Sequence, residues 1–213
     1  MSAASEATRH KLLDGALRTL IEQGIGKTSA RTIAATAGVN QGLIFYHFGS
    51  VEELLCAACV FGAEQRVARY RERFAELGSL AELLAFARQM HTEERGSGHV
   101  AVLGQLLAAG QAQPALAAAT AAGLGLWVAE LESVLTRLLA ASPLAGFADP
   151  AGLARAAAAS FVGIELYEGV DPAGAGRALD SLEQLAGLAQ TLEELGPLSQ
   201  RAVRHGLRKG ARR

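Results

Sequence analysis

The stretch Thr28–Phe48, TSARTIAATAGVNQGLIFYHF, decides the fold of this chain of 213 residues. Apolar residues recur in it at helical spacing on both sides of Gly38, which predicts two short helices joined by a tight turn. We expect Gly38 to adopt a positive φ, which glycine does at little cost, and Asn40 to cap the second helix through its side-chain oxygen. Two helices joined in this way can place the second in the major groove of DNA, so the stretch predicts a helix-turn-helix.

The two faces of this hairpin differ in chemistry. The inner face is predicted to form a small apolar core from Ile33, Ala37, Val39 and Ile44, closed from the sides by Leu17, Leu20 and Phe48. The outer face offers amides to base edges, apolar groups to thymine methyls, and polar tips to phosphates. The residues predicted to contact DNA are Thr28, Arg31, Asn40, Gln41, Gly42, Leu43, Phe45, Tyr46 and His47. A plain helical hairpin inside a larger bundle would not need this polar outer face.

The composition indicates a helical body around the hairpin. Hydrophobic residues make up 50% of the chain, largely alanine and leucine, and the mean hydropathy is +0.21. Polar residues interrupt every apolar run before the roughly 18 residues of a membrane span, and the N-terminus lacks the order of a signal peptide. We therefore expect a cytoplasmic protein without a membrane segment. The net charge of −1 argues against a protein that coats nucleic acid generally.

Helical periodicity continues through most of the chain, and prolines separate the periodic segments. After a first helical stripe ended by Gly24, helices are predicted over 28–36, from Asn40, and from a capping box at Ser50 to about Glu76. Five more are predicted near 79–95, 98–111, 114–141, 150–169 and 173–195, and Asp149-Pro150 and Asp171-Pro172 are typical helix starts. No strand pattern is found, so the predicted fold is all-α. The predicted domains are 1–50 for DNA binding, 51–196 for effector binding and dimerisation, and 197–213 as a basic tail.

The segment of about 9–55 resembles the N-terminal domain of TetR-family transcriptional regulators. The specific part is the pattern I-A-x-x-A-G-V-x-x-G-x-x-x-Y-x-x-F, which begins at Ile33. Beyond it the chain is similar to the family in layout, and SFVGIELYEGVD looks like an actinobacterial subgroup. The resemblance implies a homodimer that binds a near-palindromic operator and is released by a small-molecule effector in the C-terminal body.

One position departs from the family pattern. The family usually has a lysine after the position of Ser50, where it reaches a phosphate, and this chain has Val51. Loss of that contact should flatten the salt dependence of DNA binding by about one unit. Arg9 or the basic C-terminal tail are the candidates to compensate.

The two cysteines form the pattern Cys56-Ala-Ala-Cys59 within the predicted fourth helix. A zinc site would need further ligands at suitable spacing, and no histidine lies near in sequence. A redox pair would need a thiolate at a helix N-terminus, and these residues lie at least a turn inside the helix. We interpret them as small buried side chains, with redox sensing as the alternative, and predict no metal site and no cofactor.

An effector pocket must come from helices in the middle of the chain. Bulky apolar residues there are candidates to line it, although such residues more often form ordinary core. The predicted pocket residues are Phe86, Met90, Leu103, Leu106, Trp127, Phe161 and Glu165, with His91 and Gln105 as further polar anchors. This lining favours an apolar or aromatic effector.

A dimer interface is predicted on the last two long helices. One face of the last helix carries Leu179, Leu182, Leu185, Ala186, Ala189 and Leu192, and its predecessor carries Ala156, Ala157, Phe161 and Ile164. Two such helices from each subunit can build a four-helix bundle, although these faces can also pack only within the subunit.

The leading interpretation is a ligand-responsive DNA-binding regulator, most simply a repressor. An enzyme is not supported, because the chain has no G-x-S-x-G, no Walker loop, no H-E-x-x-H and no recognisable catalytic carboxylate pair. The alternative is a DNA-binding regulator controlled by a protein partner or by redox chemistry instead of a small ligand.

Overall fold

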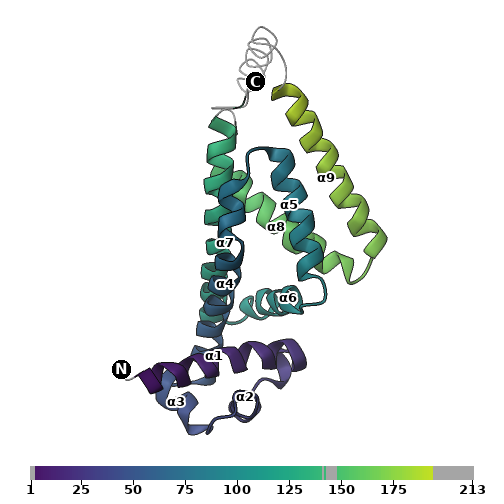
Figure 1. Cartoon of the computed structure of the whole chain (residues 1–213). Coiled ribbons are helices and arrows are strands. Elements are labelled where there is room, and N and C mark those ends of the chain that lie inside the picture. The colour runs from purple at the N-terminus through teal and green to yellow at the C-terminus, as the bar shows by residue number, and fades with distance from the viewer. Residues whose placement is uncertain (1–2, 141, 143–147, 194–213) are drawn as a thin grey trace. The chain divides into compact units, whose positions relative to one another are not determined.

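The computed structural model describes residues 3–140, 142 and 148–193. Within these residues the chain forms nine α-helices, one short 3₁₀ helix and no strand, which confirms the all-α fold class (Figure 1). In chain order the elements are α1 (Ala3–Gln23), η1 (Ile25–Lys27), α2 (Ala30–Ala37), α3 (Gly42–Phe48), α4 (Val51–Glu76), α5 (Leu80–Glu94), α6 (His99–Gly110), α7 (Pro114–Ala140), α8 (Pro150–Glu168) and α9 (Pro172–Glu193).

Side-chain caps fix several helix starts where the sequence predicts them. The Ser50 hydroxyl accepts a hydrogen bond from the Glu53 amide at 3.1 Å, at the start of α4. Asp149 caps α8 by accepting from the Ala151 amide at 3.1 Å. Local hydrogen bonds of this kind depend only on neighbouring residues, which is why the sequence predicts them well.

The start of α2 differs from the prediction. The helix begins at Ala30 and not at Thr28, because Ser29 is the N-cap and forms a reciprocal capping box with Thr32. Thr28 instead follows η1, and its hydroxyl donates to the Gly24 carbonyl at 2.9 Å. The short 3₁₀ helix between α1 and α2 was not predicted from the sequence.

The chain divides into two compact units. The first unit comprises Met1–Arg69 and Glu94–Trp127, and the second comprises Tyr70–Glu93 and Val128–Arg213. The helix-turn-helix thus shares its unit with α6 and with the first parts of α4 and α7. Residues after 193, which include the predicted basic tail 197–213, lie outside the described part of the chain.

The first unit has two apolar clusters, and both involve α1. One joins Leu12, Leu13 and Ala16 of α1 to Ile33, Ala34, Ile44, Leu54 and Ala58. The other joins Leu20 to Cys59, Val102, Leu106 and Leu116. The prediction that Leu20 closes the hairpin core is therefore wrong. Ala16 of α1 packs against the hairpin, but Leu20, one helical turn later, packs against α4, α6 and α7.

The second unit is held by an aromatic cluster and by polar links between helices. The ring of Phe86 packs edge-on against Phe74 at 4.9 Å and against Tyr70 at 6.0 Å between centroids. Arg137 of α7 donates to the carbonyls of Phe74 and Leu77, which ties α7 to the end of α4. Helices α8 and α9 contact each other and meet at an angle at their connection (Figure 1).

Helix α7 is long and apolar. It contains an 18-residue window of mean hydropathy 1.4 with at most two charges, and by length and composition it could cross a membrane. The bent pair α3–α4 passes the same test jointly. The sequence was expected to contain no membrane segment, because no unbroken apolar run is long enough. Averaged over an 18-residue window, however, the hydropathy of α7 does reach the level of a membrane span. Helix α7 buries Leu116, Leu135 and Leu139, but only 17% of its apolar window is buried in the subunit.

Candidate nucleic-acid interface and regulatory sites

The turn between α2 and α3 has the predicted backbone. Gly38 adopts φ 67° and ψ 35°, a left-handed conformation that a side chain would strain. Its amide donates to the carbonyl of Ala35, and the Val39 amide donates to Ala34, so the end of α2 is closed. The Asn40 side-chain oxygen accepts from the Gly42 amide at 2.8 Å, which starts α3 two residues after Asn40. The helix-turn-helix therefore follows from local chemistry.

Helix α1 braces α2 by close packing and hydrogen bonds. A Cβ placed on Gly15 would lie 2.6 Å from the Cβ of Ala37, so the two helices touch there. The buried hydroxyl of Thr19 bonds that of Thr36 at 3.0 Å, and Arg18 donates to the Thr36 carbonyl at 2.9 Å. These contacts hold the end of α2, and with it the turn, in one orientation.

Helix α3 presents opposite faces to the core and to solvent. Ile44 is 0% exposed, whereas the next two residues, Phe45 and Tyr46, are 50% and 78% exposed. The rings of Tyr46 and His47 pack edge-on at 4.9 Å between centroids. His47 is partly buried, so Phe45 and Tyr46 are the aromatic side chains that α3 turns to solvent, and exposed aromatic rings of this kind favour contact with a partner.

The other predicted DNA contacts fall into two groups. Arg31, Asn40, Gln41 and Gly42 are exposed as a DNA contact requires. Leu43 is partly buried and packs against the core cluster, so little of its side chain is free to reach a base. Thr28 is partly buried, and its hydroxyl donates a hydrogen bond to the carbonyl of Gly24. The hydroxyl oxygen can therefore only accept a further hydrogen bond, for example from a water bound to a phosphate.

Val51, at the position of the family's lysine, is partly buried and packs against the hairpin core. Nearby, the guanidinium of Arg9 lies 5.2 Å from the ring centroid of Phe48, the last residue of α3. Its ion pair with Glu6 is long, at 3.9 Å. Arg9 therefore lies beside the end of α3, where its guanidinium could bind a DNA phosphate.

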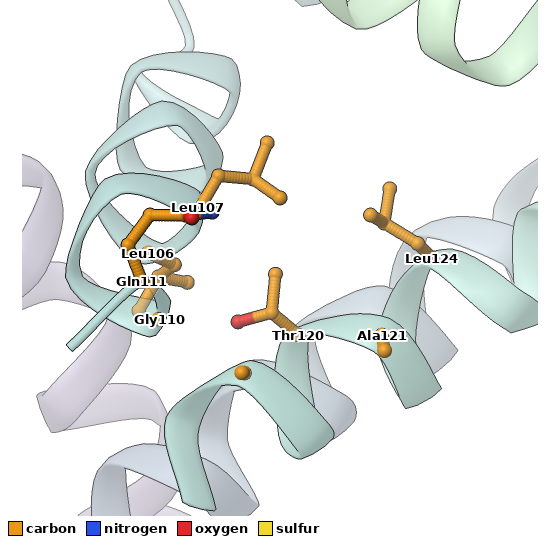
Figure 2. A pocket seen from close by; sticks show the side chains of 8 residues that line it. Leu106, Leu107, Gly110, Gln111, Thr120, Ala121 and Leu124 are labelled. Atoms are coloured by element: carbon orange, nitrogen blue, oxygen red, sulfur yellow. The ribbon is translucent and has the colours of Figure 1, made fainter. Parts of the chain in front are cut away.

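A shallow pocket of about 140 Å³ lies between α6 and α7 in the first unit (Figure 2). Leu107 and Leu124 stand on opposite sides of it, and Gln111 and Thr120 add polar groups. Of the predicted pocket residues it includes Leu106. Gln105, predicted as a polar anchor, instead accepts a hydrogen bond from the Ile25 amide at 2.8 Å.

The remaining predicted pocket residues are distributed over both units. Leu103 and Trp127 are partly buried in the first unit. In the second unit Phe86 belongs to the aromatic cluster, Met90 is buried, and Phe161 is partly buried. Residues of an ordinary hydrophobic core would be buried in the same way. The sequence left this alternative to a ligand pocket open.

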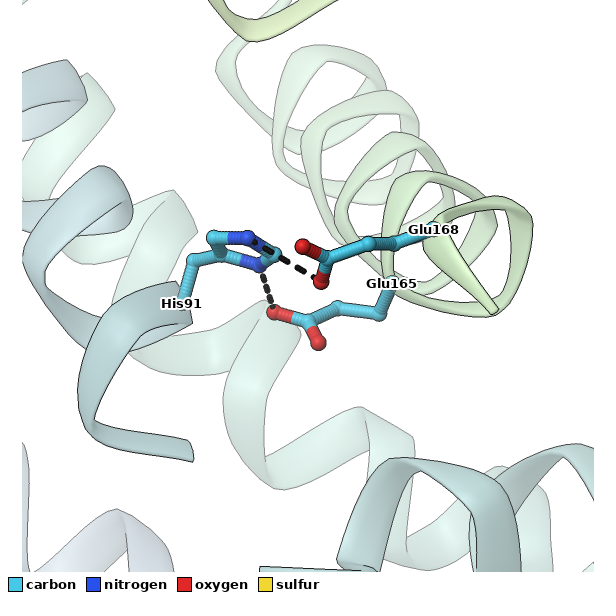
Figure 3. Close-up of side chains that lie close together, drawn as sticks. All are labelled: His91, Glu165 and Glu168. Carbon is cyan, nitrogen blue, oxygen red and sulfur yellow. Dashed lines mark hydrogen bonds and ion pairs between the residues drawn. The ribbon is translucent and has the colours of Figure 1, made fainter. Parts of the chain in front are cut away.

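Two of the predicted polar anchors do meet. His91 on α5 lies between Glu165 and Glu168, which are one turn apart on α8 (Figure 3). The sequence did not predict that Glu168 joins them or that the three side chains form a potential ligand set. Their separation of 74 residues or more leaves no local signal of it.

The predicted dimer residues are only partly described. Ile164 and Leu182 are partly buried, and Leu185 is exposed. Ala186, Ala189 and Leu192 lie in α9, but their side chains are outside the described structure. Helix α8 exposes a continuous stripe formed by Leu153, Ala156, Ser160, Gly163 and Tyr167. Helical spacing places these five on one face, and the middle three are small.

The cysteine thiols are poorly suited to redox sensing. Burial raises the pKa of Cys59, whose sulfur lies 3.8 Å from the Thr120 hydroxyl. Burial also raises the pKa of Cys56, and the carboxylates of Glu52 and Glu53 raise it further. A raised pKa keeps a thiol protonated at neutral pH and therefore unreactive.

Comparison with known proteins agrees with the geometry of the N-terminal segment. Residues 12–58 match the family described as "Bacterial regulatory proteins, tetR family". The HTH-type transcriptional regulator SrpR of Pseudomonas putida is 36% identical over 56 residues, which are 26% of this chain and 26% of that protein. AcrR of Shigella flexneri is 42% identical over 50 residues, 24% of this chain and 23% of that protein. The chain thus matches about a quarter of the length of these relatives.

Solved structures extend the likeness in fold to most of the chain. A putative TetR-family transcriptional regulator from Rhodococcus sp. has a TM-score of 0.71 at 21% identity, over 86% of this chain and 98% of that chain. Other structural neighbours come from Salmonella enterica and Cytophaga hutchinsonii. The assignment to an actinobacterial subgroup therefore stays a prediction.

A braced helix-turn-helix whose second helix turns polar and aromatic groups to solvent is the arrangement with which many transcriptional regulators bind DNA. Residues 12–58 match the family model of TetR regulators, and a structure described as a TetR-family regulator shares the fold of most of the chain. The matched proteins are named as transcriptional regulators and not as enzymes, in agreement with the lack of a catalytic motif in the sequence.

Proposed function

We propose that this chain is a ligand-responsive repressor that works in the cytoplasm. In this proposal it binds a near-palindromic operator as a homodimer, and a small apolar or aromatic effector releases it. The observation that carries the proposal is α3, which is anchored by the fully buried Ile44 and presents Phe45 and Tyr46 to solvent.

The proposed DNA contacts follow from exposure and chemistry. Asn40 and Gln41 stand at the start of α3 and offer amides to base edges, the groups that pair well with adenine. Arg31, Tyr46 and His47 serve phosphates, which position the helix without reading sequence. Phe45 offers an apolar surface to a thymine methyl. Thr28, Gly42 and Leu43 act as minor contacts or allow close approach.

Homodimerisation is supported by the exposed stripe on α8. Small side chains at Ala156, Ser160 and Gly163 permit two helices to approach closely, and Leu153 and Tyr167 flank them with apolar surface. On α9, Leu185 is exposed as well. A twofold axis through such a face makes the contact self-complementary, and it would produce a four-helix bundle from α8 and α9 of both subunits.

Effector control is supported by the position of α6. Leu106 lines the α6–α7 pocket and also belongs to the cluster with Leu20 of α1. The preceding residue, Gln105, holds the amide of Ile25 at the junction of α1 and α2. A ligand that displaces α6 would thus act directly on the segment that carries the helix-turn-helix. The pocket is smaller than the roughly 300–1,000 Å³ of most ligand sites, so binding requires that α6 and α7 separate.

The alternative is control by a protein partner or by oxidation. The raised pKa values of Cys56 and Cys59 disfavour oxidation. A protein partner would compete for an exposed surface and would not need the α6–α7 pocket. Enlarging Leu107 and Leu124 to Phe should abolish control by an effector and leave control by a protein partner unchanged.

Selection of bound sequences from random DNA with the full chain tests the core of the proposal. We expect an inverted repeat whose half-sites lie about one helical turn apart. Tyr46→Ala should weaken binding to that site at unchanged stability, and Val170→Ala serves as a control at an exposed residue in the other unit. Enrichment of a sequence without twofold symmetry would contradict binding by a dimer.

A further inference from the structure

Three ionisable side chains converge between α5 and α8 in the second unit. His91 of α5 lies with Nδ1 at 2.5 Å from Glu165 Oε1 and with Nε2 at 3.3 Å from Glu168 Oε2 (Figure 3). Their side chains are 10%, 6% and 14% exposed, respectively. Such burial is unusual for carboxylates and indicates that the three groups act together.

The helical framework explains why these groups meet. Glu165 and Glu168 are three residues apart, so α8 projects both carboxylates from the same face. That face is turned toward α5, where His91 stands in the last turn. The donors therefore come from two regular helices, which place ligands more reproducibly than loops do.

We propose that His91, Glu165 and Glu168 bind a divalent first-row transition-metal ion. Each side chain offers one donor atom, and the three donor atoms lie within 4.8 Å of one another. Ligand atoms on one tetrahedral ion with bonds of about 2.0–2.2 Å are about 3.3–3.6 Å apart. Coordination therefore requires the donor atoms to approach one another by at most about 1.2–1.5 Å, which side-chain torsions can supply.

The donor set selects the kind of ion. One imidazole nitrogen with two carboxylate oxygens suits Zn²⁺, Co²⁺, Mn²⁺ or Fe²⁺, whereas Cu⁺ prefers thiolates, and Ca²⁺ and Mg²⁺ prefer oxygen alone. The charge of +2 matches the two carboxylates of Glu165 and Glu168, which removes much of the cost of holding both anions away from water. Three protein ligands leave a coordination position open for water or for a donor atom of a small molecule.

The bound ion would link α5 to α8 within the second unit. Tyr167, between the two glutamates in sequence, belongs to the exposed stripe of α8. The metal site does not depend on the proposed operator or on the dimer, because its ligands all belong to one chain. Its test can therefore fail or succeed separately from the proposed function.

The first experiment titrates the untagged full-length chain, freed of metal by a chelator, with Zn²⁺ and with Co²⁺. Calorimetry should give one ion per chain, and the midpoint of thermal unfolding should rise by about 5–10 °C when free Zn²⁺ is about 100 times its Kd. The absorption spectrum of bound Co²⁺ should show ligand-field bands without a thiolate charge-transfer band. No saturable binding, or a thiolate band, would overturn the proposal.

Substitutions then locate the site. Glu165→Gln, Glu168→Gln and His91→Gln keep side-chain size and should each lower Zn²⁺ affinity by at least an order of magnitude, since even indirect contacts to a metal contribute about 10–100-fold. Glu72→Gln, at an exposed glutamate of the same unit, and the pair Cys56→Ala and Cys59→Ala should retain full affinity. Affinity unchanged by the first three variants, or lost with the cysteines, would refute the assignment. The Co²⁺ spectrum of the unaltered chain decides the matter if a variant does not fold.

Discussion

Within α3, Ile44 is fully buried while Phe45 and Tyr46 are the exposed bulky residues, and each flanking turn is closed by its own hydrogen bonds. On α8, by contrast, Leu153 and Tyr167 are exposed beside a run of small residues. The helix-turn-helix has a core of its own and leaves a mixed polar and aromatic surface for DNA. The α8–α9 pair exposes Leu153, Tyr167 and Leu185, an apolar surface that would favour a partner of similar chemistry.

Gly163→Arg should have the largest effect, and it acts on α8. A Cβ added at Gly163 meets nothing within 4 Å in the described chain, and the residue is exposed, so the substitution should leave the subunit folded. In a dimer it would bury an unpaired charge, which costs about 3–5 kcal/mol and weakens dimerisation by at least about 100-fold. Sedimentation of Gly125→Arg, at another unobstructed helical glycine, provides the control. If Gly163→Arg remains a dimer at micromolar concentration, the stripe is not the interface.

Ile44→Ala tests the self-contained core of the helix-turn-helix. Removing a fully buried isoleucine side chain should lower the free energy of unfolding by about 2–5 kcal/mol in urea. Phe45→Ala, one residue later, should change stability by less than about 0.5 kcal/mol and still reduce operator affinity. Equal destabilisation by the two variants would show that the division of α3 into a core face and a DNA face is wrong.

Gly15→Ala should push α1 and α2 apart locally and so destabilise their packing. The added Cβ would lie 2.6 Å from the Cβ of Ala37 and 3.1 Å from its backbone, so the helices must shift at a cost of about 1–3 kcal/mol. We expect a lower midpoint of urea unfolding together with weaker operator binding. Gly26→Ala, where nothing lies within 4 Å, should leave both unchanged. Wild-type operator affinity in Gly15→Ala would show that the brace does not position α3.

Val51→Lys should restore the charge that the family has at this position. The stem of a lysine can keep the apolar contacts of Val51 while its ammonium reaches a phosphate. The slope of log affinity against log salt should steepen by about one unit in a salt titration. Val51→Met, which is similar in length and uncharged, should leave the slope unchanged. An unchanged slope in both variants would mean that this position does not face the DNA backbone.

Replacing the cysteines should have the smallest effect. Because burial raises the pKa of Cys59 and of Cys56 above the usual 9.0, the reactive thiolate is scarce at neutral pH and increases only as the pH rises beyond that value. Alkylation by iodoacetamide should therefore be slow at pH 7 and accelerate above about pH 9. Cys56→Ser should bind the operator as the unaltered chain does. Rapid alkylation at pH 7 that releases the operator would support redox control.

Features that depend on near neighbours could be predicted from the sequence. The left-handed Gly38, the cap by Asn40, and the starts of α4 and α8 each rest on residues within a few positions of one another. Periodic apolar positions predicted the starts of the last five helices, and the ends of α5, α6 and α8, to within one residue. The start of α2 was wrong because Thr28 and Ser29 can both cap a helix, and only the reciprocal partner Thr32 distinguishes them.

Only the tertiary structure decided the contacts between distant segments. The approach of Gly15 to Ala37, the bond from the Ile25 amide to Gln105, and the meeting of His91 with Glu165 depend on how helices pack over 22 to 80 residues of chain. The sequence by itself determined an all-helical chain with a helix-turn-helix, because caps, turns and helical periodicity are local. It could not determine which helix faces meet, because many packings satisfy the same apolar pattern and the balance of close contacts selects one.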